Sequence, residues 1–391
     1  MSSYLSASWI YPITAAPLKN GVIAIREDGY IEDVFSAEEA EKTNISGIEC
    51  YDGILIPGLI NTHCHLELSH LFGKIPLHTG LPGFVQQVMQ QRSASATEIE
   101  KAIVHADAEM FRNGIVAVGD ISNQVISREV KLNSKIYYHT FVEAMGFNPQ
   151  RSEEIIIAAE NTRNSFYPLK ATIVPHAPYS VSEELFLAIS NKSGGAHESV
   201  SIHNQETIEE NHFFERKEGH FLKLYEFLGL DISFFEAKGK SSLQTFLPYL
   251  SEAAKTLLVH NTFTSRADLE FAALSNHRLF WCLCPNANLY IENRLPDVAL
   301  LQEAGLKITL GTDSLASNHQ LSILAEMLVL QDQSKVLLPV LLKWATLNGA
   351  EFLGIEHQYG SLEKGKKPGI NLITQLEEGR LTAESGIQRL Y

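Results

Sequence analysis

Short apolar segments alternate with helical segments through most of this chain, from about residue 56 onward. Eight of the apolar segments could form buried strands, and they span residues 59–62, 115–119, 136–142, 171–174, 200–202, 256–259, 279–283 and 308–311. Helical candidates between them lie at 97–113, 152–164, 182–190, 214–228 and 267–274. Eight strand–helix alternations predict an α/β fold of the (β/α)8 barrel type. An open doubly wound sheet is less favoured, because no Gly-x-Gly-x-x-Gly follows the first strand.

The two ends of the chain predict a second, smaller unit. Strand candidates at 22–25 and 30–34 flank Asp28-Gly29, which is a hairpin turn signal. Two such strands cannot form a core alone, and the C-terminal segment offers partners at 369–373 and after a turn at 377–379. We therefore predict a distorted (β/α)8 TIM barrel over residues 56–356. A small β-sandwich would be formed from both termini, residues 1–55 and 357–391.

The charge and the cysteines of the chain restrict its partners and its compartment. Lys and Arg number 31 against 46 Asp and Glu, which argues against nucleic-acid and anionic membrane surfaces because both reward basic patches. The four cysteines form no secreted disulfide framework, and neither a signal peptide nor a membrane-spanning apolar run is evident. We predict a cytoplasmic protein that acts on a small molecule.

Two histidines follow the first strand candidate, in the segment Pro57-Gly58-Leu59-Ile60-Asn61-Thr62-His63-Cys64-His65. In a β-strand, residues i and i+2 point to the same side, so His63 and His65 would project together. Two imidazoles at the end of a buried strand suit one divalent metal. On this spacing alone, an incidental pair of histidines is an equally good interpretation.

Polar residues that suit a metal site also follow three other strand candidates. His203 and Glu206 follow the fifth strand, His260 follows the sixth, and Asp313 follows the eighth within Gly311-Thr312-Asp313. A barrel builds its active site at the C-terminal ends of its strands. Any one of these residues could cap a loop. Their shared position in strand register favours a metal site.

This order of motifs resembles the amidohydrolase superfamily. More narrowly, it resembles the branch of nucleoside and nucleobase aminohydrolases that includes S-adenosylhomocysteine, methylthioadenosine and aminodeoxyfutalosine deaminases, with the triazine chlorohydrolases nearby. The likeness covers essentially the whole chain. Besides the His-x-His segment and Gly311-Thr312-Asp313, it includes Pro175-His176-Ala177-Pro178-Tyr179, Cys284-Pro285-Asn286-Ala287-Asn288 and Ser317-Asn318.

The resemblance implies roles for the polar strand-end residues. His63, His65, His203 and Asp313 would bind one divalent metal, with zinc as the favoured ion and iron or manganese as alternatives. Asp313 would also take a proton from the attacking water, and Glu206 would protonate a ring nitrogen and then assist the departure of ammonia. His260 would hold the attacking water and the tetrahedral centre.

The resemblance also implies substrate contacts and a single metal ion. His176 would contact the ribose hydroxyls and Ser317 the heterocycle, whereas Asn288 would shape a loop and Glu143 would face either the pocket or a neighbouring strand end. Binuclear relatives use a carboxylated lysine at the end of the fourth strand. Here Lys170 lies at the start of that strand, so a mononuclear site follows. Residues 70–92 would form a substrate-covering lid.

The resulting prediction is a metal-dependent aminohydrolase that releases ammonia from a small heterocyclic substrate. The preferred substrate is an adenine nucleoside such as 6-aminodeoxyfutalosine or another 5'-modified adenosine. Alternatives are a free base (guanine, cytosine or a pterin), a hydrolase that removes chloride from a heteroaromatic ring, and a non-catalytic binding protein on the same fold. No nucleic-acid or membrane partner is expected, and relatives suggest a homodimer.

Overall fold

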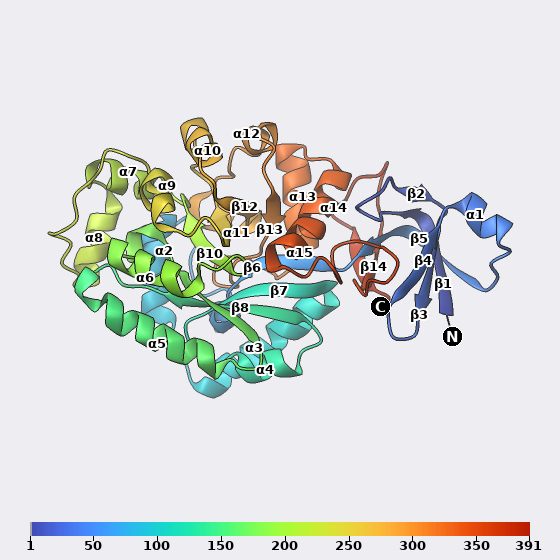
Figure 1. The fold of residues 1–391 in the computed structure, drawn as a ribbon, viewed down its shortest axis with the longest axis horizontal. Helices are drawn as coiled ribbons and strands as arrows, with labels where there is room; N and C mark the ends of the chain where they lie inside the picture. Colours follow the sequence, from blue (N-terminus) through green and yellow to red (C-terminus); the bar gives the residue numbers. More distant parts are fainter. Residues whose placement is uncertain (1) are drawn as a thin grey trace.

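The computed structural model describes residues 2–391 of the chain. Its larger part holds the parallel strands with helices around them, and a smaller β-rich part lies beside it and contains both chain ends (Figure 1). No helix within residues 2–391 has both the length and the apolar character that crossing a membrane requires.

The parallel strands form two sheets of four. The first has the order β6 (Leu59–Cys64), β7 (Ile115–Ser122), β8 (Tyr137–Ala144) and β9 (Lys170–Pro175), and the second has β10 (Ser199–Asn204), β11 (Lys255–His260), β12 (Arg278–Leu283) and β13 (Ile308–Leu310). All neighbouring pairs are parallel. These are the eight strands that the sequence predicts, and their presence is confirmed.

Backbone hydrogen bonds connect the two sheets on both sides. The N–H groups of Thr312 and Asp313 donate to the carbonyl of His63, at 3.1 Å each, where β13 meets β6. The N–H of His203 donates to the carbonyl of His176 at 3.0 Å, where β10 meets the segment after β9. The strand ends that carry the predicted site residues are therefore bonded directly to one another.

Helices lie between and around the strands (Figure 1). They are α2 (Gly80–Gln91), α3 (Ala96–Arg112), α4 (Arg128–Asn133), α5 (Ser152–Ser165), α6 (Glu183–Ser193), α7 (Ile208–Arg216), α8 (His220–Phe227), α9 (Ser242–Phe246), α10 (Arg266–Ala273), α11 (Pro285–Glu292), α12 (Val298–Glu303), α13 (Ile323–Ser334), α14 (Leu338–Ala345) and α15 (Leu347–Leu353), with 3₁₀ turns η1 (Leu66–Leu71), η2 (Pro149–Arg151), η3 (Pro178–Ser180) and η4 (Leu247–Tyr249). Serine side chains cap several of them: Ser95, Ser182 and Ser322 each accept a backbone N–H of the first turn.

The single helix predicted over 214–228 is wrong, because two helices occupy this region. α7 ends at Arg216, and α8 begins at His220. Lys217 closes α7 in the left-handed region with φ 55°, and Gly219 has φ 98°. The left-handed conformation interrupts the helical hydrogen-bond ladder, and glycine adopts it without steric cost.

Alternate residues of the parallel strands pack into two separate apolar clusters. Leu59 and Leu258 pack with residues of the surrounding helices, whereas their chain neighbours Ile60 and Leu257 belong to a second cluster that also includes Phe352. This alternation follows from the period of two along a strand. Apolar side chains fill both faces along most of each strand, so a polar site is expected at the strand ends.

The chain ends combine in one seven-stranded sheet. Its strands are β1 (Ser2–Ile10), β2 (Leu18–Lys19), β3 (Val22–Arg26), β4 (Ile31–Phe35), β5 (Ile48–Pro57), β14 (Ile370–Thr374) and β15 (Gly386–Arg389), and α1 (Ala37–Lys42) joins β4 to β5. β3 and β4 pair as the predicted hairpin, and β14 pairs with β5. The predicted C-terminal strand directly after the turn at 377–379 is displaced: Glu377 and Arg380 form only an isolated bridge, and β15 begins at Gly386.

Candidate active site

Five predicted residues from four strand ends converge beyond the C-terminal edge of the parallel strands. The Nε2 atoms of His63 and His65 are 3.1 Å apart. Asp313 Oδ1 lies 3.3 Å from His65 Nε2 and 3.6 Å from His63 Nε2. Potential ligand atoms of His63, His203, His260 and Asp313 all lie within 4.8 Å of one another. The cluster is buried, so these polar atoms have little access to solvent.

The protonation states of these histidines fit a metal site. Burial lowers the pKa of His65 to about 3 and that of His260 to about 4, and it lowers the pKa of His203 well below its usual value. Neutral imidazoles keep the lone pair that a metal requires. His203 Nδ1 lies 2.8 Å from the carbonyl oxygen of His176, so it carries the proton and leaves Nε2 as the ligand atom.

The spacing of the donors also fits a metal ion. Ligands about 2.0–2.1 Å from a tetrahedral zinc ion lie roughly 3.3 Å from one another. The distances of 3.1, 3.3 and 3.6 Å among His63, His65 and Asp313 match this value. A nitrogen and carboxylate donor set suits zinc, and iron and manganese accept it too. The residues present therefore fit a single divalent cation.

Asp313 is held in a strained backbone conformation and fixed by a neighbouring hydroxyl. Its φ of 55° lies in the left-handed region, which is uncommon outside glycine and turns its side chain back toward His63. Ser317 Oγ donates to Asp313 Oδ2 at 2.5 Å. Burial alone would raise the pKa of Asp313, but the hydrogen bond to His63 and the charges of His65 and His260 outweigh it and lower this pKa.

Position 311, in the segment Gly311-Thr312-Asp313, needs glycine because a larger residue would clash with its neighbours. A Cβ on Gly311 would lie 2.9 Å from both the Cβ and the carbonyl oxygen of His63, and 2.8 Å from Cys282 Sγ. Contacts this short are not tolerated between carbon and backbone atoms. Gly311 therefore permits the close approach of β13 to the end of β6 that brings Asp313 to the two histidines.

Glu206 lies beside His260 at the edge of the cluster. Glu206 Oε2 lies 3.6 Å from His260 Nε2, and both side chains are almost fully buried. Burial, with a smaller contribution from Asp313, raises the pKa of Glu206 well above its usual value. His260 Nδ1 donates to Asn288 Oδ1 at 2.8 Å, which orients the imidazole. The arrangement places a carboxyl group with a raised pKa beside a group of metal-type ligands.

A pocket opens onto this cluster. Its inner end is formed by His65, His203, Glu206, His260 and Asp313, and its outer wall by Leu81, Phe84, Val85, Val88 and Met89 of α2 together with Arg92. The segment 70–92, which the sequence predicts to be a substrate-covering lid, thus contributes residues to the lining of the pocket. His70 ties the start of this segment to its end, since His70 Nε2 lies 3.0 Å from the carbonyl of Arg92.

The two predicted substrate contacts occupy different positions. His176 lines the pocket, half-buried, with Nδ1 2.6 Å from Ser180 Oγ. Ser317 has no exposed surface, and its neighbour Ser314 lines the pocket instead. The observed contact of Ser317 is with Asp313 and not with the cavity. Lys170 is exposed at the start of β9, and within residues 2–391 no lysine lines the pocket. The mononuclear site stays a prediction.

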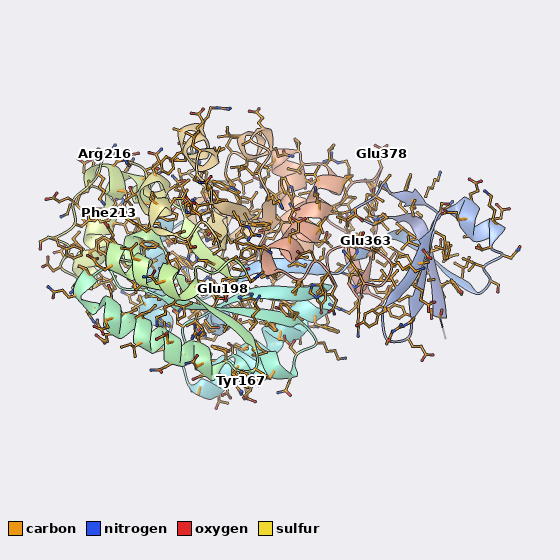
Figure 2. All side chains as sticks on the ribbon, in the orientation of Figure 1. Tyr167, Glu198, Phe213, Arg216, Glu363 and Glu378 are labelled. Carbon is orange, nitrogen blue, oxygen red and sulfur yellow. The ribbon has the colours of Figure 1, made fainter. Side chains whose placement is uncertain are left out.

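An aromatic cluster supports the pocket from α7 and α8. Tyr179, which lines the pocket, packs against Phe221 in a tilted arrangement with ring centroids 4.4 Å apart, and Tyr225 Oη donates to the carbonyl of Tyr179 at 2.5 Å. Phe213 on α7 is fully buried in the same cluster, whereas Arg216 on the same helix points outward (Figure 2). The two helices that replace the single predicted one therefore hold one wall of the pocket.

Sequence reasoning missed several buried charged residues around the site. Lys131 on α4 forms an ion pair of 2.6 Å with Asp120 near the end of β7, and both side chains are fully buried. Glu326 on α13 accepts from the backbone N–H of Asn286 and from Asn318 Nδ2, at 2.9 Å each. Asp120 lies near the C-terminal end of β7, directly after the strand segment predicted at 115–119, so it could have been found by the same rule as Asp313. The two helical residues carry no comparable signal.

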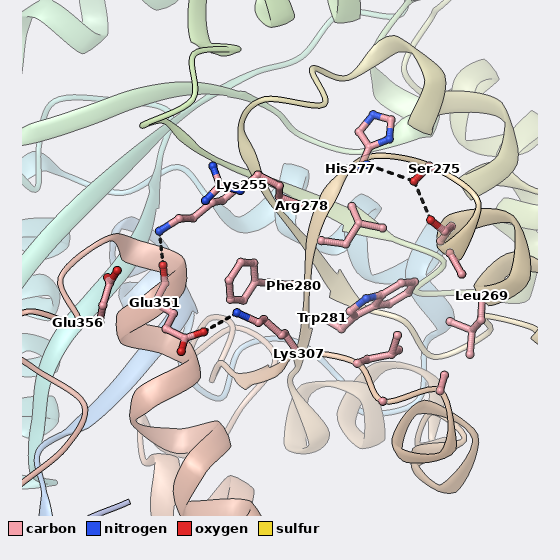
Figure 3. A pocket seen from close by; sticks show the side chains of 16 residues that line it. Lys255, Leu269, Ser275, His277, Arg278, Phe280, Trp281, Lys307, Glu351 and Glu356 are labelled. Carbon is pink, nitrogen blue, oxygen red and sulfur yellow. Dashed lines mark hydrogen bonds and ion pairs between the residues drawn. The ribbon is translucent and has the colours of Figure 1, made fainter. Parts of the chain in front are cut away.

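A second, larger cavity lies at the other end of the strands (Figure 3). It has a volume of about 610 Å³ and is lined by Lys255 and Arg278, the first residues of β11 and β12, and by Lys307 just before β13. Lys307 Nζ pairs with Glu351 Oε2 at 2.7 Å, and Arg278 donates to two backbone carbonyls. Its cations are already paired, and none of the predicted site residues lines it.

Comparison with known proteins identifies the family. The model of the amidohydrolase family matches residues 54–383, so the chain belongs to the amidohydrolase family. An adenosine deaminase of Helicobacter pylori is 28% identical over 331 residues, which cover 82% of this chain and 79% of that protein. A 5-methylthioadenosine/S-adenosylhomocysteine deaminase of Teredinibacter turnerae is 27% identical over 387 residues, 94% of this chain and 82% of that protein.

The fold comparison agrees with this assignment. The crystal structure of Helicobacter pylori aminofutalosine deaminase in complex with methylthio-coformycin superposes with a TM-score of 0.81, covers 97% of this chain and 93% of that chain, and is 24% identical in sequence. This likeness concerns the fold. The predicted resemblance to the amidohydrolase superfamily is confirmed.

Proposed function

We propose that this chain is a metal-dependent aminohydrolase that deaminates an adenine nucleoside and releases ammonia. The observation that carries the proposal is the buried Glu206, whose pKa is raised, beside the His63, His65, His203 and Asp313 cluster. A carboxyl group with a raised pKa keeps its proton to higher pH than an ordinary carboxyl group, and it can donate that proton to a ring nitrogen. The names of the two curated relatives, both deaminases of adenosine-type nucleosides, support the same reaction.

His63, His65, His203 and Asp313 would hold the cation, with zinc as the favoured ion. When bound, it would supply Lewis-acid activation of a water molecule. Asp313 takes a proton from the attacking water, and His260, oriented by Asn288, holds that water by a hydrogen bond. Glu206 protonates the ring nitrogen next to the reacting carbon. Water adds to that carbon, and the proton taken up by Asp313 passes to the amino group, which leaves as ammonia. The added hydroxyl returns its proton to Glu206 and becomes a new ring carbonyl group.

We infer specificity from the outer half of the pocket. His176 would contact the sugar, and the apolar wall of α2 suits a substituent at the 5' carbon of the sugar. This supports a 5'-modified adenosine, with 6-aminodeoxyfutalosine as the leading candidate. Ser317 would act by holding Asp313, and its predicted contact with the heterocycle is the less supported role because the side chain is fully buried.

We also infer a closed barrel and a terminal sandwich as the domain organisation. The hydrogen bonds from Thr312 and Asp313 to His63, and from His203 to His176, support closure of the two four-stranded sheets into one (β/α)8 barrel over residues 56–356. The single sheet formed by both termini supports a separate unit of residues 1–55 and 357–391, with two packed layers as the proposed arrangement. The homodimer and the cytoplasmic location stay predictions.

Ammonia release from the zinc-loaded protein tests the proposed function. The panel holds adenosine, methylthioadenosine, S-adenosylhomocysteine, 6-aminodeoxyfutalosine, guanine, cytosine and a chlorotriazine. We expect strong release from at least one adenine nucleoside and little from the free bases. Chloride release from the triazine without ammonia from any nucleoside would replace the proposal by the chlorohydrolase alternative.

A further inference from the structure

Glu143 is a buried carboxylate in the active-site pocket that the proposed reaction does not use. It lies next to the last residue of β8 and lines the pocket, with a side chain that is 3% exposed. Its Oε2 accepts from Asn123 Nδ2 at 2.9 Å. Its Oε1 is buried and has no hydrogen-bond partner within residues 2–391. Buried carboxylate oxygens rarely stay unpaired, because the lost hydration is not replaced.

The neighbouring imidazole of His203 does not satisfy this oxygen. His203 Nδ1 lies 3.7 Å from Glu143 Oε1, but its proton is directed to the carbonyl of His176 at 2.8 Å. The same hydrogen bond opposes a second cation held by Glu143, His176 and His203, since the nitrogen of His203 that faces Glu143 is already protonated. The unpaired oxygen therefore points to a donor that arrives with the substrate.

His176 offers a second acceptor beside Glu143. Ser180 Oγ donates to the carbonyl of Ala177 at 3.1 Å, so it accepts from His176 Nδ1 at 2.6 Å. The proton of His176 is thereby placed on Nδ1, and Nε2 keeps a free lone pair. Ligand atoms of His176 and Glu143 lie within 4.8 Å of each other. Acceptors on two side chains this close to each other can take the protons of two neighbouring hydroxyl groups.

The position of Glu143 and His176 relative to the metal ligands fits the position of the sugar in a bound nucleoside. His203 turns Nδ1 toward Glu143, while its other ring nitrogen is the one available to the metal cluster. Glu143 and His176 therefore lie about one imidazole ring away from the reacting end of the pocket. A nucleoside likewise places its sugar across the width of the base from the amino group that is removed.

We propose that Glu143 accepts a hydrogen bond from one hydroxyl of the ribose cis-diol while His176 accepts from the other, and that Asn123 positions the Glu143 carboxylate. This inference rests on the proposed function and narrows it, because a free base or a dideoxy sugar leaves Glu143 Oε1 unpaired. Glu143 is then a specificity-determining residue for ribonucleosides.

The test compares adenosine, 2'-deoxyadenosine, 3'-deoxyadenosine and adenine as substrates of the zinc-loaded wild type and of Glu143→Gln. We expect the wild type to lose about 10- to 100-fold in kcat/KM when the hydroxyl bound by Glu143 is removed, as for a hydrogen bond to a charged group. Glu143→Gln should lose a similar factor with adenosine and at most about twofold with that deoxynucleoside. This coupling is what a double-mutant cycle measures.

Glu67→Gln is the matched control. Glu67 also lines the pocket, but its Oε2 already accepts from the backbone N–H groups of Asn123 and Gln124, at 3.0 and 3.2 Å. Its replacement should affect ribo- and deoxynucleosides equally. Asn123→Ala should reproduce the hydroxyl-dependent loss of Glu143→Gln with a smaller factor, which keeps the test informative if one variant folds poorly. Metal content and thermal unfolding of every variant check that the fold is retained.

Results of two kinds, one from the wild type and one from the Glu143→Gln variant, would overturn the inference while leaving the proposed function intact. One is a wild type that deaminates adenosine and both deoxynucleosides equally well. The other is a Glu143→Gln variant that loses the same factor with all three, or that drops from two bound metal ions to one. A wild type that releases ammonia from no adenine nucleoside would instead remove the proposed function and the inference with it.

Discussion

The two ends of the parallel strands differ in how their polar groups are satisfied. At the N-terminal ends, the cavity of about 610 Å³ is lined by cations that already have partners, such as Lys307 with Glu351. At the C-terminal ends, the pocket of about 140 Å³ is lined by Glu143, whose buried Oε1 has no hydrogen-bond partner within residues 2–391. Size therefore does not locate the functional site. A single unpaired polar atom does not locate it either, since His277 Nδ1 at the larger cavity is also buried without a partner in the part of the chain that the structure describes. The site is located by the potential ligand atoms of His63, His203, His260 and Asp313, which gather only at the C-terminal ends.

The largest effect is expected from Asp313→Ala, at the C-terminal end. This change removes a metal ligand and a proton acceptor together, so we expect loss of bound zinc and a fall of at least about 10⁴-fold in kcat/KM. Metal analysis and ammonia release measure both. Asp52→Ala, at an exposed position of β5, should leave both unchanged. A fully active Asp313→Ala protein would show that the end of β13 is not part of the site.

Glu206→Gln should lose less, because it removes a proton donor without touching a proposed ligand. We expect kcat to fall by about 10²- to 10⁴-fold with the metal content unchanged. Single-turnover ammonia release, combined with metal analysis, separates the two properties. Glu215→Gln, which changes an exposed partner of Arg216, is the control. Normal turnover by the Glu206 variant would contradict the proposed role of Glu206 as the proton donor.

Lys131→Met tests the buried ion pair at the C-terminal end. Removal of Lys131 leaves Asp120 charged and fully buried, so we expect the free energy of unfolding to fall by about 3–5 kcal/mol. Urea denaturation measures this loss. The double variant Asp120→Asn/Lys131→Met should recover part of it, because no unpaired charge remains. A loss below about 1 kcal/mol would mean that water reaches the pair.

The pH dependence of stability tests Glu326. Burial raises the pKa of Glu326 to about 8 from 4.5, despite hydrogen bonds from Asn286 and Asn318 that lower it. Between pH 4.5 and about pH 8, Glu326 keeps a proton in the folded chain that it releases in the unfolded chain. The free energy of unfolding should therefore fall as the pH rises, by up to about 1.4 kcal/mol per pH unit from this group.

Glu326→Gln should flatten this dependence between pH 5 and 8, because glutamine does not titrate. Denaturation with urea at several pH values measures the slope in both proteins. The absolute stability of the variant is a separate quantity, since glutamine offers one acceptor oxygen where the carboxyl group offers two. An unchanged slope would assign the pH dependence to other groups.

The smallest effect is expected from Lys307→Ala, at the N-terminal end. Lys307 is 58% exposed and its partner Glu351 31%, and pairs this accessible to solvent contribute about 0.2–1 kcal/mol. Activity and metal content should not change. Loss of activity in this variant would contradict the contrast between the two ends, because it would connect the larger cavity to catalysis.

Much of the fold and of the metal cluster could be predicted because both follow from local rules. The period of two along a strand places His63 and His65 on one side, and parallel strands bring their C-terminal ends together. The eight strands, the Asp28-Gly29 hairpin and the convergence of the histidines with Asp313 follow from these rules. The continuous helix over 214–228 failed because apolar residues occur on both sides of a break at Gly219.

Side-chain pairings across the fold could not be predicted. Three contacts depend on how helices pack against strand ends. They are the hydrogen bond of Ser317 to Asp313, the ion pair of Lys131 with Asp120, and the hydrogen bonds that Glu326 accepts from Asn286 and Asn318. Helix packing determines which polar residues become buried. The local sequence pattern does not predict this, because buried and exposed polar residues look alike in it.

By itself, the sequence of this protein determined the strand order along the chain, the family and the residues available for the metal cluster, because strand periodicity and motif spacing act over a few residues. Only the tertiary structure decided that Glu143 Oε1 is left unpaired beside His176 and that Glu206 is buried against His260. Such properties depend on desolvation and on distances between residues far apart in the chain, and both arise only when the elements pack together.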